Sequence, residues 1–141
     1  MSFEAFMKRN KRVKANVKYA ATKSLVDENG KSLEWEIKAV STKEAEKIRE
    51  ACTMEVPVKG KPGMFRPKLN ADLYTAKMVA AAIVYPDLYN AELQNSYGVT
   101  TPEELLKEMV DCPAEYLDLS TFVQQHSGFE TLGEKVAEAK N

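Results

Sequence analysis

The chain has 141 residues, of which 44% are hydrophobic and 29% charged, and its formal net charge at pH 7 is −1. A chain of this length most simply forms one domain, with a core large enough to fold without metals or disulfides. The composition is ordinary for a soluble globular protein. No window approaches the ~18 uninterrupted apolar residues of a membrane span, so we expect no membrane-spanning helix.

The charges are divided unevenly along the chain. Residues 1–70 contain 16 Lys and Arg against 9 Asp and Glu, whereas residues 71–141 contain 4 against 12. One interpretation is that a basic half packs beside an acidic half of the same fold. The other is that opposite charges attract successive copies of the chain head to tail. The sequence leaves both open.

The first forty residues predict a short helix and a β-hairpin. Phe3, Phe6 and Met7 would share one face of a helix that Ser2 caps, and a basic stretch follows at residues 8–18. No apolar stretch follows these basic residues, so we expect a cytoplasmic protein without a signal peptide. Residues 17–26 and 33–39 predict two strands joined at Asn29-Gly30. The alternation of the second strand predicts a buried face, formed by Leu33, Trp35, Ile37 and Ala39.

A helix over about 42–53 is predicted next. Ser41 and Glu44 have the spacing of a capping box, and Ala45, Ile48 and Cys52 form an apolar stripe behind it. Residues 54–69 contain three prolines and two glycines. This composition predicts an exposed, mobile loop.

The most apolar stretch of the chain is Leu73–Tyr85, which carries a single charge before Pro86. Its length and its alanine content predict one helix at the centre of the fold. A short helix from about Ala91 would end at Gly98. Thr101-Pro-Glu-Glu104 then combines an N-cap, a first-turn proline and a capping glutamate, which predicts another helix start.

Two further helical segments are predicted at the end of the chain. The first begins near Pro113 and carries the apolar residues Tyr116, Leu117, Leu119 and Val123. The second is an amphipathic stripe in which four residues recur at helical spacing: Phe129, Leu132, Val136 and Ala139.

These elements together predict an α+β fold, mainly α, in which a small N-terminal antiparallel β-hairpin packs on a bundle of short helices. We expect one domain over residues 1–141 with three parts. Residues 1–40 hold the N-terminal helix and the hairpin, residues 41–69 a helix and the mobile loop, and residues 70–141 the helical part.

The residue types offer no catalytic, metal-binding or cofactor-binding pattern. His126 is the one histidine, and its position near a helix end has a structural explanation in the helix dipole. Cys52 and Cys112 stand alone, so we expect two small buried hydrophobic residues rather than a disulfide or a zinc site. No glycine pattern would hold a phosphate. The sequence therefore predicts a protein that is not an enzyme and has no cofactor.

Two segments are candidates for contact with a partner. The basic residues 8–18 form a solvated face, a patch for a protein partner, or a nucleic-acid contact. The stripe formed by Phe129, Leu132, Val136 and Ala139 either docks on its own core or presents its apolar face to another protein.

Three segments carry a family resemblance, which extends over roughly residues 33–110. They are Trp35-Glu-Ile-Lys-Ala-Val-Ser41, Ile83-Val-Tyr-Pro-Asp-Leu88 and Ser96-Tyr-Gly-Val99. With them the chain resembles the XkdN-like family of phage tail assembly chaperones, of the Bacillus prophage type. The motifs are core and capping patterns and contain no chemical signature.

The resemblance implies a non-enzymatic assembly factor in the host cytoplasm, absent from the mature virion. Such a factor would bind the tape measure protein and keep it soluble while tail tube subunits polymerise around it. The tail tube protein and further copies of the chain are additional candidate partners. Two alternatives remain: a small nucleic-acid-associated regulatory protein using residues 8–18, and a structural tail component.

Overall fold

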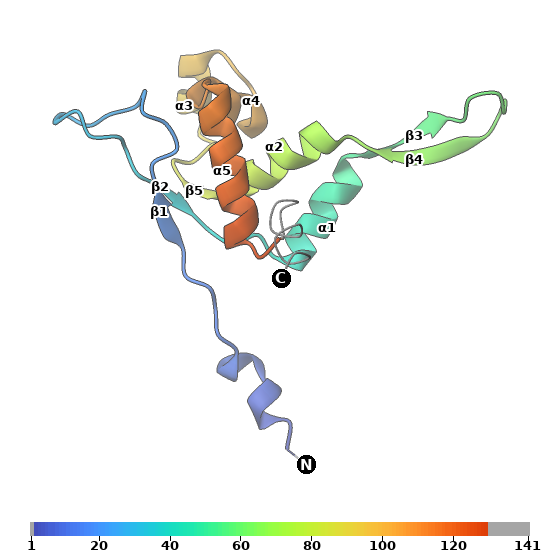
Figure 1. Cartoon of the computed structure of the whole chain (residues 1–141), viewed down its shortest axis with the longest axis horizontal. Helices are drawn as coiled ribbons and strands as arrows, with labels where there is room; N and C mark the ends of the chain where they lie inside the picture. Colours follow the sequence, from blue (N-terminus) through green and yellow to red (C-terminus); the bar gives the residue numbers. More distant parts are fainter. Residues whose placement is uncertain (1, 130–141) are drawn as a thin grey trace, which may run out of the picture.

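A computed structural model describes residues 2–129 of the chain (Figure 1). The described part contains five α-helices and five short strands, and the strands form two separate antiparallel sheets. The predicted fold class, α+β and mainly α with an N-terminal β-hairpin, is confirmed. The helices are α1 (Thr42–Ala51), α2 (Ala71–Ala82), α3 (Ala91–Tyr97), α4 (Pro102–Met109) and α5 (Pro113–His126).

The larger sheet has the strand order β1 (Val17–Tyr19), β2 (Trp35–Ile37), β5 (Ile83–Tyr85). Strands β1 and β2 form the predicted hairpin, with Val17 opposite Ile37 and Tyr19 opposite Trp35. The connection turns at Gly30, whose φ of 79° suits glycine.

The hairpin differs from its prediction at Leu33. Trp35 and Ile37 are buried as expected, but 43% of Leu33 is exposed. The reason is that the regular ladder covers only three residues on each strand. Between Tyr19 and Trp35 the two segments of the connection contact each other closer to the turn. The Leu33 amide donates to the Leu25 carbonyl, and Val26 forms an isolated bridge with Ser32. Leu33 therefore lies outside the part of the sheet that faces the core.

The sequence predicted one helix over the apolar run Leu73–Tyr85, and this prediction is wrong. Helix α2 ends at Ala82, and Ile83–Tyr85 forms strand β5 on the free side of β2, with Ile83 opposite Ile37. Ile83 and Val84 are β-branched and fit a strand better than a helix end. Pairing with β2 supplies backbone hydrogen bonds to Ile83–Tyr85, and the sequence of this short segment alone cannot predict that partner.

Helix α2 lies at the centre of the fold, as predicted, and contacts α1, α4, α5 and β5. Its buried residues are Ala76, Met78, Val79, Ala80 and Ala82. Small alanine side chains let neighbouring elements approach the helix backbone closely. The largest fully buried side chains of the core are Trp35, Ile37, Leu88, Leu105, Leu106 and Leu119.

The predicted helix starts are confirmed by their hydrogen bonds. Ser41 and Glu44 form the capping box of α1, in which the Glu44 amide donates to the Ser41 hydroxyl at 3.2 Å. The Thr101 hydroxyl accepts from the Glu104 amide at the start of α4. Gly98 ends α3 in the left-handed conformation with a φ of 70°.

Two side chains in the region of α5 are exposed, Leu117 and Cys112, and of these Cys112 was predicted to be buried. Leu117 is 65% exposed on α5, because Leu119 and Val123, which are buried on the same helix, define a core-facing stripe that does not include it. Cys112 is exposed as well, since it precedes α5 at the surface, whereas Cys52 is buried as expected. Both thiols are free.

Residues 54–69 are exposed, as predicted, but they are not a loop. They form most of an antiparallel hairpin, β3 (Thr53–Pro57) and β4 (Phe65–Leu69). Figure 1 shows this hairpin projecting away from the helices. Pro57 and Pro67 lie at positions where the ladder needs no backbone N–H donor, so they are compatible with a two-stranded sheet.

Candidate functional site

Two of the segments that project from the helical body are rich in exposed apolar side chains (Figure 1). We call residues 2–16 the N-terminal arm and residues 53–69 the hairpin arm. Neither contains a buried residue. Because folding does not use these side chains, both arms are candidate interaction surfaces.

The N-terminal arm begins with two 3-10 turns, η1 (Glu4–Phe6) and η2 (Lys8–Asn10), in place of the single short helix predicted. Its exposed apolar residues are Phe3 at 70%, Phe6 at 85%, Met7 at 46% and Val13 at 89%. Side chains of this size are usually found inside a protein. Their exposure on a projecting segment makes the N-terminal arm a candidate contact surface.

The basic residues of the N-terminal arm are also exposed. Arg9 pairs with Glu4 within the arm, whereas Lys18, on β1, pairs with Glu36 of the neighbouring strand at 3.2 Å. The Asn16 amide donates to Glu36 as well, at 3.0 Å. The Glu36 contacts fix the point at which the arm leaves the sheet, and the remaining cations face solvent.

The hairpin arm has two distinct faces. Met54 lies opposite Lys68 and Val56 opposite Arg66, while the Val58 amide donates to the Met64 carbonyl at 2.9 Å. Residues directly opposite in an antiparallel pair point to the same side. One face therefore consists of Met54, Val56, Val58, Met64, Arg66 and Lys68, and we call it the methionine face.

Both outer edges of the hairpin arm carry a proline. Cys52–Asn70 and Val58–Met64 are hydrogen-bonded pairs. Hydrogen-bonded and non-hydrogen-bonded pairs alternate along an antiparallel ladder, and residues of the non-hydrogen-bonded pairs direct their backbone N–H and C=O groups away from the partner strand. Pro57 and Pro67 belong to these outward pairs, opposite Phe65 and Glu55. A proline on an edge removes a donor and opposes the addition of another strand. The arm is thus suited to contact through side chains rather than by strand pairing.

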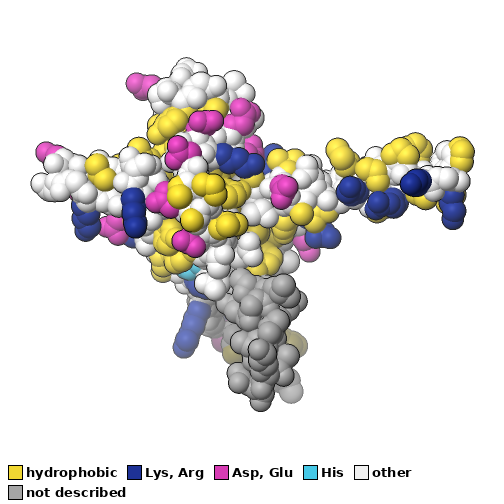
Figure 2. Space-filling model, turned by 45° about the horizontal axis from the view of Figure 1, so that its top comes forward, with side chains coloured by type: hydrophobic (Ala, Val, Ile, Leu, Met, Phe, Trp, Pro, Cys, Tyr) yellow, Lys and Arg dark blue, Asp and Glu magenta, His cyan; other side chains and the backbone are white. Residues whose placement is uncertain are grey.

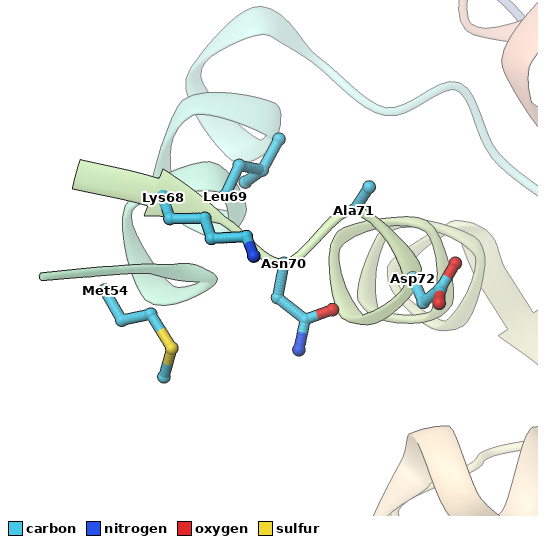
Figure 3. Close-up of a pocket in the computed structure, with 6 residues that line it drawn as sticks. All are labelled: Met54, Lys68, Leu69, Asn70, Ala71 and Asp72. Atoms are coloured by element: carbon cyan, nitrogen blue, oxygen red, sulfur yellow. The ribbon is translucent and has the colours of Figure 1, made fainter. Parts of the chain in front are cut away.

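The root of the hairpin arm is anchored to two helices. Asn70 donates its amide to the Cys52 carbonyl at 2.8 Å, and its side chain caps α2 by accepting from the Leu73 amide at 3.1 Å. An open hollow of about 310 Å³ lies at this junction. Figure 3 shows the residues that line it, which are Met54, Lys68, Leu69, Asn70, Ala71 and Asp72. The polar side chain of Asn70 is occupied by capping, which leaves Lys68 and Asp72 as the charged side chains that line the hollow.

The predicted partner stripe lies largely outside the described residues. Of its four members only Phe129 is described, whereas Leu132, Val136 and Ala139 are not. Phe129 is half-buried against the core and lines a hollow together with Val40, Ala45 and Tyr74. The structure thus brings the first residue of the stripe onto the body of the same chain.

His126 has a structural role at the end of α5. Its ring stacks on Phe122 with centroids 6.0 Å apart, and Phe122 stacks on Tyr19 of β1 at 4.3 Å.

Burial raises the pKa of the Cys52 thiol, the opposite of what an activated nucleophile needs. Within residues 2–129, no group of three His, Cys, Asp or Glu side chains could hold a metal ion.

None of the helices in the described part is both long and apolar enough to span a bilayer. The geometry defines a small α+β protein whose distinctive features are its projecting surfaces.

Comparison with known proteins identifies the class. The profile of the phage XkdN-like tail assembly chaperone proteins matches residues 3–140. The chain therefore belongs to this family, in agreement with the resemblance found in the sequence.

Two relatives come from Bacillus subtilis strain 168. The XkdN protein of the phage-like element PBSX is 25% identical over 126 residues, which is 89% of this chain and 84% of the relative. The uncharacterized protein YqbN is 24% identical over 123 residues, 87% and 81% of the two chains. The crystal structure of YqbN matches with a TM-score of 0.77 at 20% identity, covering 92% of this chain and 98% of that one, and thus has the same fold.

Sequence reasoning missed the hairpin arm as an ordered surface. The alternation of Met54, Val56 and Val58 with Glu55 and Pro57 is a period-two strand signal, but the prolines and glycines concealed it. The paired strand Phe65–Leu69 gives no such signal by itself.

Proposed function

We propose that this protein is a non-enzymatic tail assembly chaperone that binds the tape measure protein and keeps it soluble during assembly of a phage tail. It would act in the host cytoplasm and be absent from the mature virion. Membership of the tail assembly chaperone family supports tail proteins as its partners. The tape measure protein and the tail tube protein are those that the family resemblance implies.

The observation that carries the proposal is the exposure of Phe3, Phe6 and Val13 on the N-terminal arm. A holdase covers apolar segments of its client, and needs apolar side chains that its own fold does not use. Contacts through large aromatic side chains bury much area for each residue ordered. The adjacent cations keep such an arm soluble when no client is bound.

The stripe formed by Phe129, Leu132, Val136 and Ala139 remains a second candidate partner surface. The packing of Phe129 on the core favours docking of its first residue on the same chain. The prediction of a partner contact therefore depends on Leu132, Val136 and Ala139.

Co-expression with the tape measure protein of the same phage tests the function. We expect this client to be soluble with the wild-type chain and insoluble without it. The double variant Phe3→Ser, Phe6→Ser should leave the client insoluble while the chaperone itself stays folded. The matched control is Val26→Ser, which changes an exposed apolar residue on the β1–β2 connection and should leave client solubility unchanged. A client that is insoluble with and without the wild-type chain contradicts the proposal.

A further inference from the structure

The hairpin arm carries positive charge that residues 2–129 do not compensate. It contains Lys59, Lys61, Arg66 and Lys68 but one acid, Glu55. None of the four cations forms an ion pair with another residue in this range. Figure 2 shows basic and hydrophobic side chains together along the projecting arm. These cations are therefore available to a partner.

The register of the ladder divides the methionine face lengthwise. On the β3 side it contains Met54, Val56 and, just beyond the strand, Val58, which are all apolar. On the β4 side Lys68 lies opposite Met54, and Arg66 lies opposite Val56. The one acid of the arm points to the other face, because successive side chains of a strand alternate between faces. The methionine face thus has an apolar column beside two cations and contains no acid.

The apolar column has dimensions that suit a helix. From Met54 to Val58 it extends over four residue steps, which is about 13 Å at ~3.3 Å per residue. This length corresponds to about two and a half turns of an α-helix, at about 5.4 Å per turn. Met54 is 59% exposed at one end of the face, and Met64 is 54% exposed at the other. Methionine side chains adapt readily to a partner, and a helix commonly covers the apolar face of a sheet by its apolar stripe.

Two other kinds of contact suit the arm less well. Pro57 and Pro67 oppose the addition of a strand at its edges. Single-stranded nucleic acid binds by stacking its bases on aromatic side chains next to cations. The one aromatic residue of the arm, Phe65, lies opposite Pro57 and so points to the face that lacks Arg66 and Lys68. An apolar partner with acidic groups fits the methionine face better.

We propose that the methionine face binds an amphipathic helix of a client protein. The apolar stripe of this helix packs on the valines and methionines, and Asp or Glu side chains beside the stripe pair with Arg66 and Lys68. Charge complementarity selects the acidic border, and the apolar column selects the helix. The contact deepens the proposed function and rests on it for the identity of the client, a phage tail protein. Together with the N-terminal arm it would hold a long client at two points, which increases avidity.

Binding of designed peptides to the purified full chain tests this chemistry without any tail protein. Two fluorescent helical peptides have the same length and the same leucine stripe, but Glu borders the stripe in one and Gln in the other. Fluorescence anisotropy measures their dissociation constants at about 0.05 M and about 0.5 M salt, because salt screens exposed charges. We expect the Glu peptide to bind about five- to tenfold more tightly at low salt, and this preference to shrink at high salt.

Paired variants locate the contact. Arg66→Glu with Lys68→Glu should remove the preference for the Glu peptide, and Met54→Ser with Met64→Ser should weaken the binding of both peptides. The matched control for charge is Lys59→Glu with Lys61→Glu, which makes the same change in the turn, beyond the ladder.

The control for apolar surface is Phe65→Ser, on the opposite face. Both controls should bind the two peptides like the wild type. Circular dichroism verifies that each variant is folded, which we expect because the arm buries none of its residues.

The proposal is overturned if the wild type binds both peptides equally, or if the reversal at Arg66 and Lys68 has no more effect than the control at Lys59 and Lys61. It is also overturned if a thymidine oligonucleotide binds the wild type more tightly than the Glu peptide and the Arg66 and Lys68 reversal abolishes that binding. Self-association of the wild type that the same reversal abolishes would place a second copy on this face instead. Because the assay contains no tail protein, its failure leaves the proposed chaperone function standing, and failure of the co-expression assay leaves the measured preference for the acidic helix standing.

Discussion

Glu115 in the first turn of α5 is hydrogen-bonded to Thr22, which lies just after β1 and 93 positions away in the sequence. The Thr22 hydroxyl donates to the Glu115 carboxylate at 2.8 Å, and the backbone amide of Lys23 donates to its other oxygen at 2.8 Å. Thr22 is 1% exposed. This carboxylate thus ties the chain after β1 to the last described helix.

The Glu115 contact predicts a specific dependence of stability on pH. The hydrogen bond from the Lys23 amide, followed by that from Thr22, lowers the pKa of Glu115 below its ordinary value of 4.5. A lowered folded-state pKa stabilises the fold fully above the unfolded-state pKa, and the contribution is lost as the pH falls through the folded-state value.

The variant Glu115→Gln should therefore be less stable than the wild type at neutral pH, and the difference should shrink below about pH 4.5. Urea midpoints measured at several pH values provide the comparison. The control is Glu108→Gln, an exposed acid of α4 for which we expect no such difference. A pH-independent loss of stability in Glu115→Gln would contradict the assigned contact.

Helix α5 offers a matched pair of leucines. Leu119 is fully buried and Leu117 is 65% exposed two residues earlier. We expect Leu119→Ala to lower the free energy of unfolding by about 2–5 kcal/mol, because a buried cavity is left behind. Leu117→Ala should change it by less than about 0.5 kcal/mol. Denaturant unfolding measures both, and equal losses would show that the orientation of α5 is wrong.

The capping box of α1 should contribute measurably to stability. In Ser41→Ala the Glu44 amide loses the hydroxyl from which it now has a 3.2 Å hydrogen bond. We expect a loss of about 1 kcal/mol in the free energy of unfolding. Lys43→Ala, on the exposed side of the same helix, is the control and should be nearly neutral. Thermal unfolding at neutral pH distinguishes the two variants.

The basic residues of the N-terminal arm separate the chaperone from the nucleic-acid alternative. Replacing Lys8, Arg9, Lys11 and Arg12 by Gln removes charge without removing Phe3 or Phe6. We expect the client to remain soluble in co-expression. If the wild type instead binds DNA or RNA with the salt dependence of phosphate contacts, and this variant does not, the regulatory alternative is favoured.

Truncation tests the C-terminal partner stripe. A chain that ends at Phe129 keeps the residue that packs on the core and removes Leu132, Val136 and Ala139. We expect its thermal stability to match that of the full chain and its binding to the client to weaken. Collapse of the fold would show instead that the stripe belongs to the core.

Detection of the protein in purified phage particles would favour the structural tail component.

The sequence alone determined the features that depend on near neighbours in the chain. The Ser41–Glu44 capping box, the helix start at Thr101 and the glycine at Gly98 each involve residues within a single helical turn. Such contacts form wherever the chain is helical, so their spacing is legible without a fold.

Tertiary structure decided the features that depend on distant partners. Whether Ile83–Tyr85 continues a helix or forms a strand was settled by β2, and the hairpin arm needed two segments of unremarkable pattern to pair. Leu117 and Leu119 have the same chemistry, and only the packing of α5 against α2 made one a core residue and the other a surface residue. Burial is a property of the assembled fold, and periodicity within one short helix constrains it weakly.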